Sequence, residues 1–319
     1  MKKTEFVSFV VPVYNTQAYL AECIRSILLQ EGNYDFEIIM VDDASSDESE
    51  SVARSFVDSR IKYIRHEKNQ GSDVTINHGF SLAKGDFIAR IDSDDRYETW
   101  FLKETIPILE SNQDVGMVYG QVNLINQQGQ CTDEAGTPDF QNDFKKNQFL
   151  DLLFSNFIPA PTVIARRQAW QDVLPIPSGL QWSDWYLSLK IARTWKLFFK
   201  KMILANYRVH PGNMHTVFIR NKKGEKYLFE IFNKIFNEER AFISEHKNKV
   251  YASHYAALGN QYFYEKMFFD ARRCYLKSIM LNPTKNIKFK TVARLLGACV
   301  GEKNYEVIKK IILSPLRVF

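Results

Sequence analysis

Residues 87–95 read FIARIDSDD, an apolar strand from Phe87 to Ile91 followed at once by Asp92, Asp94 and Asp95. Three carboxylates within four residues repel one another, and a hard cation such as Mg²⁺ or Mn²⁺, which prefers oxygen ligands, relieves that repulsion. A solvated acidic turn is the structural alternative. The stretch therefore predicts a buried strand that ends in either a metal site or an acidic turn.

Upstream of this stretch, strand and helix patterns alternate. Apolar, β-rich runs span 6–13, 36–41 and 61–64, and helical patterns follow at 20–28, 47–57 and 72–83. Such alternation with short connections predicts a parallel sheet covered by helices, with ligands beyond the carboxyl ends of the strands. Those ends carry Tyr14-Asn15, Asp42-Asp43 and Asp92–Asp95.

The second half begins with a predicted helix at 98–110 and a strand at 115–125. A surface loop is expected over 131–147, a helix over 184–192 and a strand over 197–209; after Asn213 the pattern is entirely helical. Within that helical region, seven residues have the spacing of a tetratricopeptide repeat: Tyr255, Leu258, Gly259, Tyr262, Ala271, Tyr275 and Pro283. This spacing predicts a helical hairpin whose small residues let the two helices touch.

The composition is that of a globular protein, with 319 residues, 45% hydrophobic and 25% charged. This length suggests a catalytic domain and a smaller one. Residues 220–319 hold 20 Lys and Arg against 9 Asp and Glu, which suits an anionic membrane face or polymer, or simply a solvated helical surface.

The cysteines Cys23, Cys131, Cys274 and Cys299 show neither metal-ligand spacing nor a disulfide framework, so a reducing cytoplasm fits best. Pro12 interrupts the apolar run near the start, which argues against a signal peptide. The chain has no apolar run of ~18 residues that could span a bilayer.

Two strand ends have both a binding and a structural interpretation. Asp42 could accept hydrogen bonds from a nucleobase imide or a ribose hydroxyl. The structural interpretation is that Ser45 or Ser46 caps a helix whose first turn holds Asp47 and Glu48, and both can hold together because Asp42 and Asp43 precede the cap. Tyr14 could stack on a base or pack in the core.

An ordered set of motifs resembles the family 2 glycosyltransferases of the GT-A fold. The set comprises Val10–Asn15, Val41–Asp47, Asn69–Gly71, Asn77–Gly79, Ala83–Gly85 and Asp92–Asp95, and the resemblance covers about the first 210 residues. It implies a nucleotide-diphospho-sugar donor, inversion at the anomeric carbon and a divalent metal, Mn²⁺ or Mg²⁺. One departure is Thr75-Ile76, where the family usually has a small residue followed by Arg.

The resemblance also implies roles for particular residues. The donor site would contain Pro12, Val13, Tyr14, Asp42, Asp43, Gly71, Asn77, Asp92 and Ser93, and the metal ligands would be Asp94, Asp92 and His210. Asp184 corresponds to the catalytic base, with Asp95, Trp182 and Trp185 near the sugar or the acceptor; Ser183 stands where Glu is frequent. The structural alternatives are helix capping by Ser183 and Asp184, packing by the tryptophans, and a turn role for His210.

Together these observations predict an α/β GT-A fold, a Rossmann-like and mostly parallel sheet with helices on both faces, plus an all-α C-terminal region. The expected boundaries are 1–215 for the catalytic domain, with a donor half 1–110 and an acceptor half 111–215, and 216–319 for the helical domain, with the hairpin near 252–285. A single repeat of this kind is not stable alone, so the hairpin should pack on neighbouring helices.

The expected activity is inverting transfer of a sugar, with a UDP-sugar favoured, to a saccharide, lipid-linked or protein hydroxyl, as in polysaccharide biosynthesis. Nucleic acid is not an expected partner. We expect a cytoplasmic enzyme, and the basic tail suggests peripheral contact with the inner membrane face or a protein.

Three other functions compete with this one. A nucleotidyltransferase or a dinucleotide-binding dehydrogenase would carry a Gly-rich loop after the first strand, and Val10–Asn15 contains neither Gly nor Lys or Arg. The remaining alternative is a catalytically degenerate scaffold that binds partners through its helical tail. Thr75-Ile76 leaves that alternative open.

Overall fold

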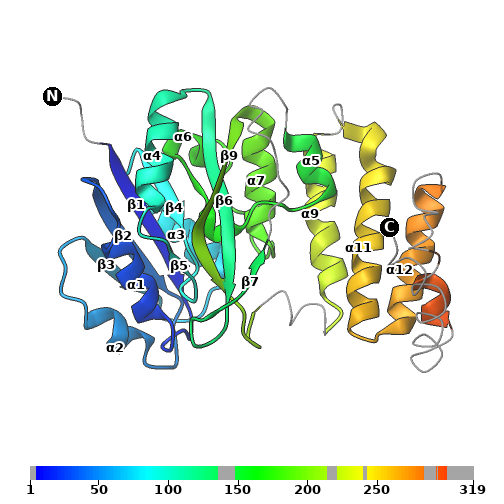
Figure 1. Ribbon diagram of the computed structural model, residues 1–319, viewed down its shortest axis with the longest axis horizontal. Helices are drawn as coiled ribbons and strands as arrows, with labels where there is room; N and C mark the ends of the chain where they lie inside the picture. The colour runs from blue at the N-terminus through cyan, green and yellow to red at the C-terminus, as the bar shows by residue number, and fades with distance from the viewer. Residues whose placement is uncertain are drawn as a thin grey trace, which may run out of the picture. The chain divides into compact units, whose positions relative to one another are not determined.

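The computed structural model describes residues 5–135, 148–213, 221–239, 243–283, 292 and 294–299. The chain divides into two compact units (Figure 1): residues 1–152 with 156–210, and residues 153–155 with 211–319. Of the predicted surface loop, residues 131–135 form a strand, and the remainder lies outside the described residues. Of the basic region 220–319, residues 284–291, 293 and 300–319 at its end also lie outside them. Among the described residues, no helix has the length and apolar character needed to cross a bilayer.

The first unit alternates strands and helices. Its strands are β1 (Phe6–Val13), β2 (Asp35–Asp42), β3 (Ile61–Arg65), β4 (Phe87–Arg90), β5 (Arg96–Tyr97), β6 (Val115–Ile125), β7 (Cys131–Ala135), β8 (Ile164–Arg166) and β9 (Lys196–Arg208). Its helices are α1 (Leu20–Leu28), α2 (Ser49–Arg54), α3 (Ser72–Leu82), α4 (Phe101–Ser111), α6 (Arg167–Gln171) and α7 (Ser183–Thr194), with the 3-10 turn η1 (Ala160–Thr162). Helix α5 (Gln148–Phe154) runs across the division between the units.

The strands form one sheet in the order β3-β2-β1-β4-β8-β6-β9-β5, with β7 on β6. Strands β1 to β4 pair in parallel, as expected of the donor half. Beyond β4 the sheet is mixed, because β8 runs antiparallel to β4 and β6 whereas β6 and β9 are parallel. The α/β fold class is thus confirmed, and the mostly parallel character belongs to the first half.

Helices cover both faces of the parallel strands (Figure 1), because β1 and β2 are apolar on both sides. Phe9 and Val11 pack in one core with residues of α1 and α4. On the opposite face α3 lies so close that a Cβ added at Gly79 would be 2.5 Å from Val10. The parallel strands are therefore closely packed on both faces, and the loops at their carboxyl edge start from this packed sheet.

The second unit is helical, with α9 (Gly224–Glu238), the 3-10 turn η2 (Ser244–His246), α11 (Lys247–Tyr264) and α12 (Phe268–Leu281). Helices α11 and α12 form a hairpin (Figure 1). A Cβ at Gly259 would lie 2.7 Å from the Tyr275 ring, so the missing side chain allows the close approach. The predicted hairpin therefore exists, and its likeness to a tetratricopeptide repeat stays a prediction. Near the end of the basic region, Arg294 donates to Asn260 and Tyr264.

Candidate active site

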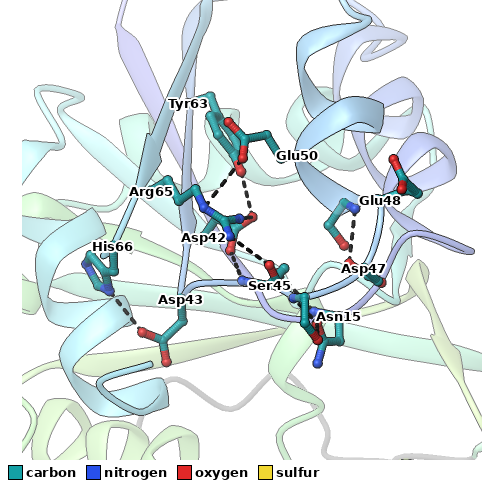
Figure 2. A network of polar contacts seen from close by, with 12 residues as sticks. Asn15, Asp42, Asp43, Ser45, Asp47, Glu48, Glu50, Tyr63, Arg65 and His66 are labelled. Carbon is teal, nitrogen blue, oxygen red and sulfur yellow. Dashed lines mark hydrogen bonds and ion pairs between the residues drawn. The ribbon is translucent and has the colours of Figure 1, made fainter. Parts of the chain in front are cut away.

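The loops after β1 and β2 hold each other in place (Figure 2). The backbone N–H of Asn15 donates to Ser45 Oγ at 3.0 Å, and Asn15 Oδ1 accepts from the backbone N–H of Ser46 at 2.8 Å. Asn15 and Ala44 both have positive φ, 51° and 59°, which few residues with a side chain adopt. Strained backbone of this kind persists where its surroundings determine it, and it is enriched at functional sites.

Helix α2 begins later than the sequence predicts. It starts at Ser49, and Asp47 Oδ1 accepts from the Ser49 N–H at 3.0 Å. Capping by Ser45 or Ser46 is therefore wrong. Both serines instead form hydrogen bonds with Asn15 in the neighbouring loop.

Asp42 is fully buried in the wall beneath these loops. Its Oδ1 accepts from the Ser45 N–H at 2.7 Å, and its Oδ2 accepts from Tyr63 Oη at 2.6 Å and Arg65 Nη1 at 3.3 Å (Figure 2). Burial and the adjacent Asp42 carboxylate raise the pKa of Tyr63, so the phenol stays a donor. Asp42 orders the loop after β2, and its direct contact with a base stays a prediction.

Asp43 fastens the turn that precedes α3. Its carboxylate accepts from His66 Nδ1 at 2.9 Å and from the N–H groups of Gln70 and Gly71, each at 2.8 Å. Burial acts to raise the pKa of Asp43, but these hydrogen bonds outweigh it and hold the pKa below its usual value. Gly71 has φ +95°, which favours glycine at this turn.

The other predicted donor residues differ in exposure. Tyr14 is 51% exposed, which leaves its ring free of the core. Pro12 is half-buried, and Val13 is buried and accepts the Asp43 N–H through its carbonyl. Because the Tyr14 ring is exposed at a strand end, it could stack on a base, and the alternative that it packs in the core is disfavoured.

Two more predicted features of the donor half lie on α3. The amide of Asn77 is bonded to the backbone of Ile176, at 2.8 and 2.9 Å. Thr75 and Ile76, where the family pattern departs, are both buried. The position that usually carries Arg thus holds an apolar side chain inside the fold.

The acidic motif lies at the end of β4 against the loop after β9. Asp94 Oδ2 lies 2.9 Å from His210 Nε2, and Asp92 Oδ1 lies 2.5 Å from Arg90 Nη2. Asp95 is buried and accepts the Arg208 N–H at 2.8 Å. The resemblance made His210 a metal ligand, with a turn role as the alternative, and the structure brings its ring to the acidic motif.

Ser93 and Cys23 tie this motif to its neighbours. Ser93 is buried, and its Oγ lies 2.9 Å from Thr16 Oγ1, which joins the acidic motif to the loop after β1. The Cys23 thiol on α1 faces the Asp92 carbonyl at 3.9 Å. Burial and the nearby carboxylates raise the pKa of Cys23, so it stays a neutral thiol.

Arg208 organises the acidic motif, and the sequence analysis did not identify it. Its side chain is 1% exposed; Nε donates to the Asp94 carbonyl at 2.8 Å, and the guanidinium also bonds to Glu22. Its guanidinium lies 4.7 Å from the Tyr19 ring centre. An Arg at the end of a predicted strand, two residues before His210, was the available signal, because a buried charge needs partners.

Asp184 lies in the first turn of α7, and Trp182 before it has φ 53°. Asp184 Oδ2 lies 3.5 Å from Asn156 Nδ2, a weak hydrogen bond at best. Trp185 is 8% exposed and donates to the Leu152 carbonyl at 2.9 Å, so it packs in the core. Trp182 is half-buried, and of the two tryptophans it is the better placed to contact a ligand.

The carboxylates of this region influence one another. Burial raises the pKa of Asp95, and Asp94 and Asp92 raise it further. Burial also raises the pKa of Asp184; Arg90 opposes the rise and Asp92 adds to it. Asp184 therefore shares an electrostatic environment with the acidic motif, which is typical of functional sites.

Asp94 and His210 fit a divalent cation as two of its ligands. Mn²⁺ binds both carboxylate oxygen and imidazole nitrogen, and these two groups lie in contact here. The remaining coordination positions of the cation would be left for phosphate oxygens and water. Asp92 is held by Arg90, and the described residues contain no group of three His, Cys, Asp or Glu arranged to hold a metal. The protein would thus supply few of the ligands.

Known proteins resemble both the sequence and the fold. The sequence profile of Glycosyl transferase family 2 matches residues 8–172. An uncharacterised glycosyltransferase of Nostoc is 29% identical over 219 residues, 66% of each chain, and the glycosyltransferase GlyG of Streptococcus pneumoniae is 43% identical over 94 residues, 29% of this chain and 31% of that one. The chain thus covers less than two thirds of the length of either relative.

Solved structures share the fold at low sequence identity. The Staphylococcus aureus protein TarS (residues 1–349) in complex with UDP-GlcNAc has a TM-score of 0.56 at 18% identity, over 95% of this chain and 90% of that one. The Pyrobaculum calidifontis mannosyltransferase PcManGT, in complex with GDP-Man and Mn²⁺, has a TM-score of 0.58 at 18% identity, over 94% and 87%. With the profile match over more than half of its length, this chain belongs to glycosyl transferase family 2.

Proposed function

We propose that this protein is an inverting glycosyltransferase that moves a sugar from a nucleotide-diphospho-sugar, preferably a UDP-sugar, to a hydroxyl group. The observation that carries the proposal is the contact of Asp94 with His210 at the carboxyl edge of the sheet. In α/β sheets this edge is where ligands bind. The nucleotides in the solved TarS and PcManGT complexes support the donor class.

In the proposed donor site, Tyr14 stacks on the base, and Asp42 and Asp43 shape the pocket wall. Pro12, Val13 and Gly71 contribute backbone to it. The loops after β1 and β2 are already held by reciprocal hydrogen bonds, so little ordering cost remains when a donor binds.

In the proposed mechanism, Asp184 accepts the proton of the acceptor hydroxyl while that oxygen attacks the anomeric carbon. The bond from this carbon to the diphosphate oxygen breaks on the opposite face, so one displacement inverts the stereocentre. A positioned base of this kind typically contributes ~10²–10⁴ in rate. A divalent cation held by Asp94 and His210, with Asp92 close by, would neutralise charge on the departing diphosphate.

Residues near the sugar and the acceptor complete the proposal. Asp95 is buried and accepts the Arg208 N–H, so in this proposal it acts on the sugar indirectly, by fixing the conformation of the acidic motif. Trp182 lies two residues before Asp184 and would face the acceptor.

A calorimetric binding screen tests the donor site. UDP, GDP, CDP and dTDP are titrated with and without Mn²⁺ into wild type, Asp94→Ala and the control Asp114→Asn, an exposed acid paired with Lys196 at the start of β6. We expect UDP to bind in the presence of Mn²⁺, and binding to weaken at least tenfold in Asp94→Ala only. Binding of no nucleotide would favour the scaffold alternative.

The chemistry is tested on the donor that binds. Wild type should release nucleotide from the UDP-sugar in the presence of an acceptor, and Asp184→Asn should lose this while still binding UDP. Equal turnover by both proteins would remove Asp184 from the mechanism.

A further inference from the structure

Helix α3 holds the loop that leads to Asp184, although about a hundred residues of chain lie between them. The Asn77 side chain donates from Nδ2 to the Ile176 carbonyl at 2.9 Å, and its Oδ1 accepts the Ile176 N–H at 2.8 Å. One turn earlier on α3, Asp73 Oδ2 accepts the Gly179 N–H at 2.8 Å. Three hydrogen bonds from one helix therefore fasten the segment 176–179.

These bonds are sheltered and leave the segment little freedom. Asp73 is 5% exposed and Ile176 is 2% exposed. Leu180 is also buried, and its N–H donates to the Pro177 carbonyl at 3.2 Å. Because buried polar groups that lose a partner are costly, the backbone of 176–180 is strongly determined by α3.

The fastened segment precedes Asp184 by only a few residues. Trp182, between them, has φ 53°, and α7 begins at Ser183. A shift of residues 176–179 would therefore pass through this turn to the first turn of α7, where Asp184 lies. The contact of the Asp184 carboxylate with Asn156 Nδ2, at 3.5 Å, is too weak to resist such a shift.

The start of α3 is also fastened on the donor side. Asp43, at the end of β2, accepts the N–H groups of Gln70 and Gly71, and α3 starts at the next residue. One helix thus connects the wall of the proposed nucleotide pocket to the loop that carries the proposed base.

We propose that Asp73 and Asn77 are positioning residues that hold segment 176–179, so that Asp184 lies where it can accept the acceptor proton. The proposal rests on the assignment of Asp184 as the base in the proposed function. It gives Asn77 a role in the acceptor half rather than direct contact with the donor. Since a displacement of about 1 Å can cost ~10²-fold in rate, loss of these bonds should affect turnover.

The test compares Asp73→Ala, Asn77→Ala and the conservative Asp73→Asn with wild type. For each, steady-state kinetics give kcat and the donor KM, calorimetry gives the UDP Kd, and thermal unfolding gives Tm. Asn112→Ala is the matched control, because Asn112 also bonds a backbone carbonyl, that of Ile108, at the end of α4. Asp73→Ala removes a single hydrogen bond, so it still tests the proposal if Asn77→Ala does not fold.

We expect kcat to fall about ten- to a hundredfold in the two alanine variants, with the UDP Kd and donor KM within twofold of wild type. Asp73→Asn keeps an acceptor for the Gly179 N–H and should recover most of kcat. Asn112→Ala should keep wild-type kcat.

Two results would overturn the inference. One is an unchanged kcat in the folded alanine variants, and the other is a UDP affinity that falls as far as kcat, which would make Asn77 a donor contact. Asp184→Asn, measured in parallel, separates the two claims. If it keeps wild-type kcat, the base assignment fails, whatever the α3 variants do.

Discussion

His210 Nε2 lies 2.9 Å from Asp94 Oδ2, across a sequence separation of 116 residues. The antiparallel pairing of β5 with β9, in which Arg96 is opposite Asn206, produces this contact, because extending that register brings Asp94 beside Arg208. The Tyr19 ring packs against the His210 ring at a tilt of 35°, with the ring centres 5.2 Å apart. A short, two-residue strand therefore decides the geometry of the proposed cation site.

Replacing His210 with Ala should weaken Mn²⁺-dependent UDP binding by on the order of tenfold or more, because one of two adjacent donors is lost. Calorimetric titration of Mn²⁺ into the protein with UDP present measures this. His246→Ala is the control, since His246 lies in the helical unit beside Glu245. An unchanged Mn²⁺ requirement in His210→Ala would exclude it as a ligand.

The pH dependence of transfer should report Asp184. A general base must be deprotonated, so the rate falls as the pH drops through the pKa of Asp184, which burial raises above the usual value for Asp. Arg90 opposes that rise, so Arg90→Gln should move the acid limb of the profile to higher pH. The measurement is kcat/KM against pH, with Arg167→Gln as the control. An unmoved acid limb in Arg90→Gln would contradict this electrostatic coupling.

Asp184→Asn should abolish most of the activity without lowering the stability of the protein. A carboxyl with a raised pKa in the folded state lowers stability above that pKa, and the loss is recovered as the pH falls through it. The variant should therefore have an equal or higher Tm at pH 7.5, while transfer falls by ~10²-fold or more. A clearly lower Tm would show that Asp184 is structural.

His254 should make the helical unit sensitive to acid. Its Nε2–H donates to the Leu153 carbonyl at 2.7 Å, and burial lowers its pKa to about 4. The unfolded chain therefore binds the proton more readily than the folded one. The free energy of unfolding is greatest above the unfolded pKa of about 6.5, and it falls by up to ~3 kcal/mol as the pH drops towards 4. His254→Gln can keep the donor without titrating, so urea unfolding from pH 7.5 to 4.5 should show a shallower loss. Parallel curves for the two proteins would contradict this assignment.

Gly259→Ala should destabilise the α11–α12 hairpin. The added Cβ would lie 2.7 Å from the Tyr275 ring, and overpacking of this kind typically costs about 1–3 kcal/mol. The better helix propensity of Ala returns up to about 1 kcal/mol, so a net loss is expected. Chemical unfolding followed by far-UV circular dichroism measures it, with Ala257→Gly on the same helix as a control for propensity. A gain in stability would mean that the helices can separate without cost.

Local patterns predicted most elements of the first unit to within a few residues. The apolar run at Val115–Ile125 is a strand with those same bounds, and the helix expected over 72–83 is Ser72–Leu82. Helix α2 was predicted too long: it starts at Ser49 and ends at Arg54, and neither serine caps it. Caps depend on which side chain reaches an N–H group, and Asn15, from another loop, had already engaged the serines.

Contacts with distant parts of the chain also decided where each predicted site residue lies. Asp94 and His210 lie in contact, Tyr14 is exposed, and Trp185 is in the core. Arg208 was missed because its partners come from α1, the acidic motif and the turn after β6. No spacing along the chain encodes such a set.

The sequence by itself determined the strand and helix periods, the acidic motif after β4 and the family, because each depends on residues close together in the chain. Only the tertiary structure decided which distant groups meet: His210 with Asp94, Arg208 with Glu22, and Asn77 with Ile176. Those contacts follow from the register of β9 on β5 and from the packing of α3 on β1. Register and packing arise from many weak interactions summed over the whole sheet, which no single stretch of sequence contains.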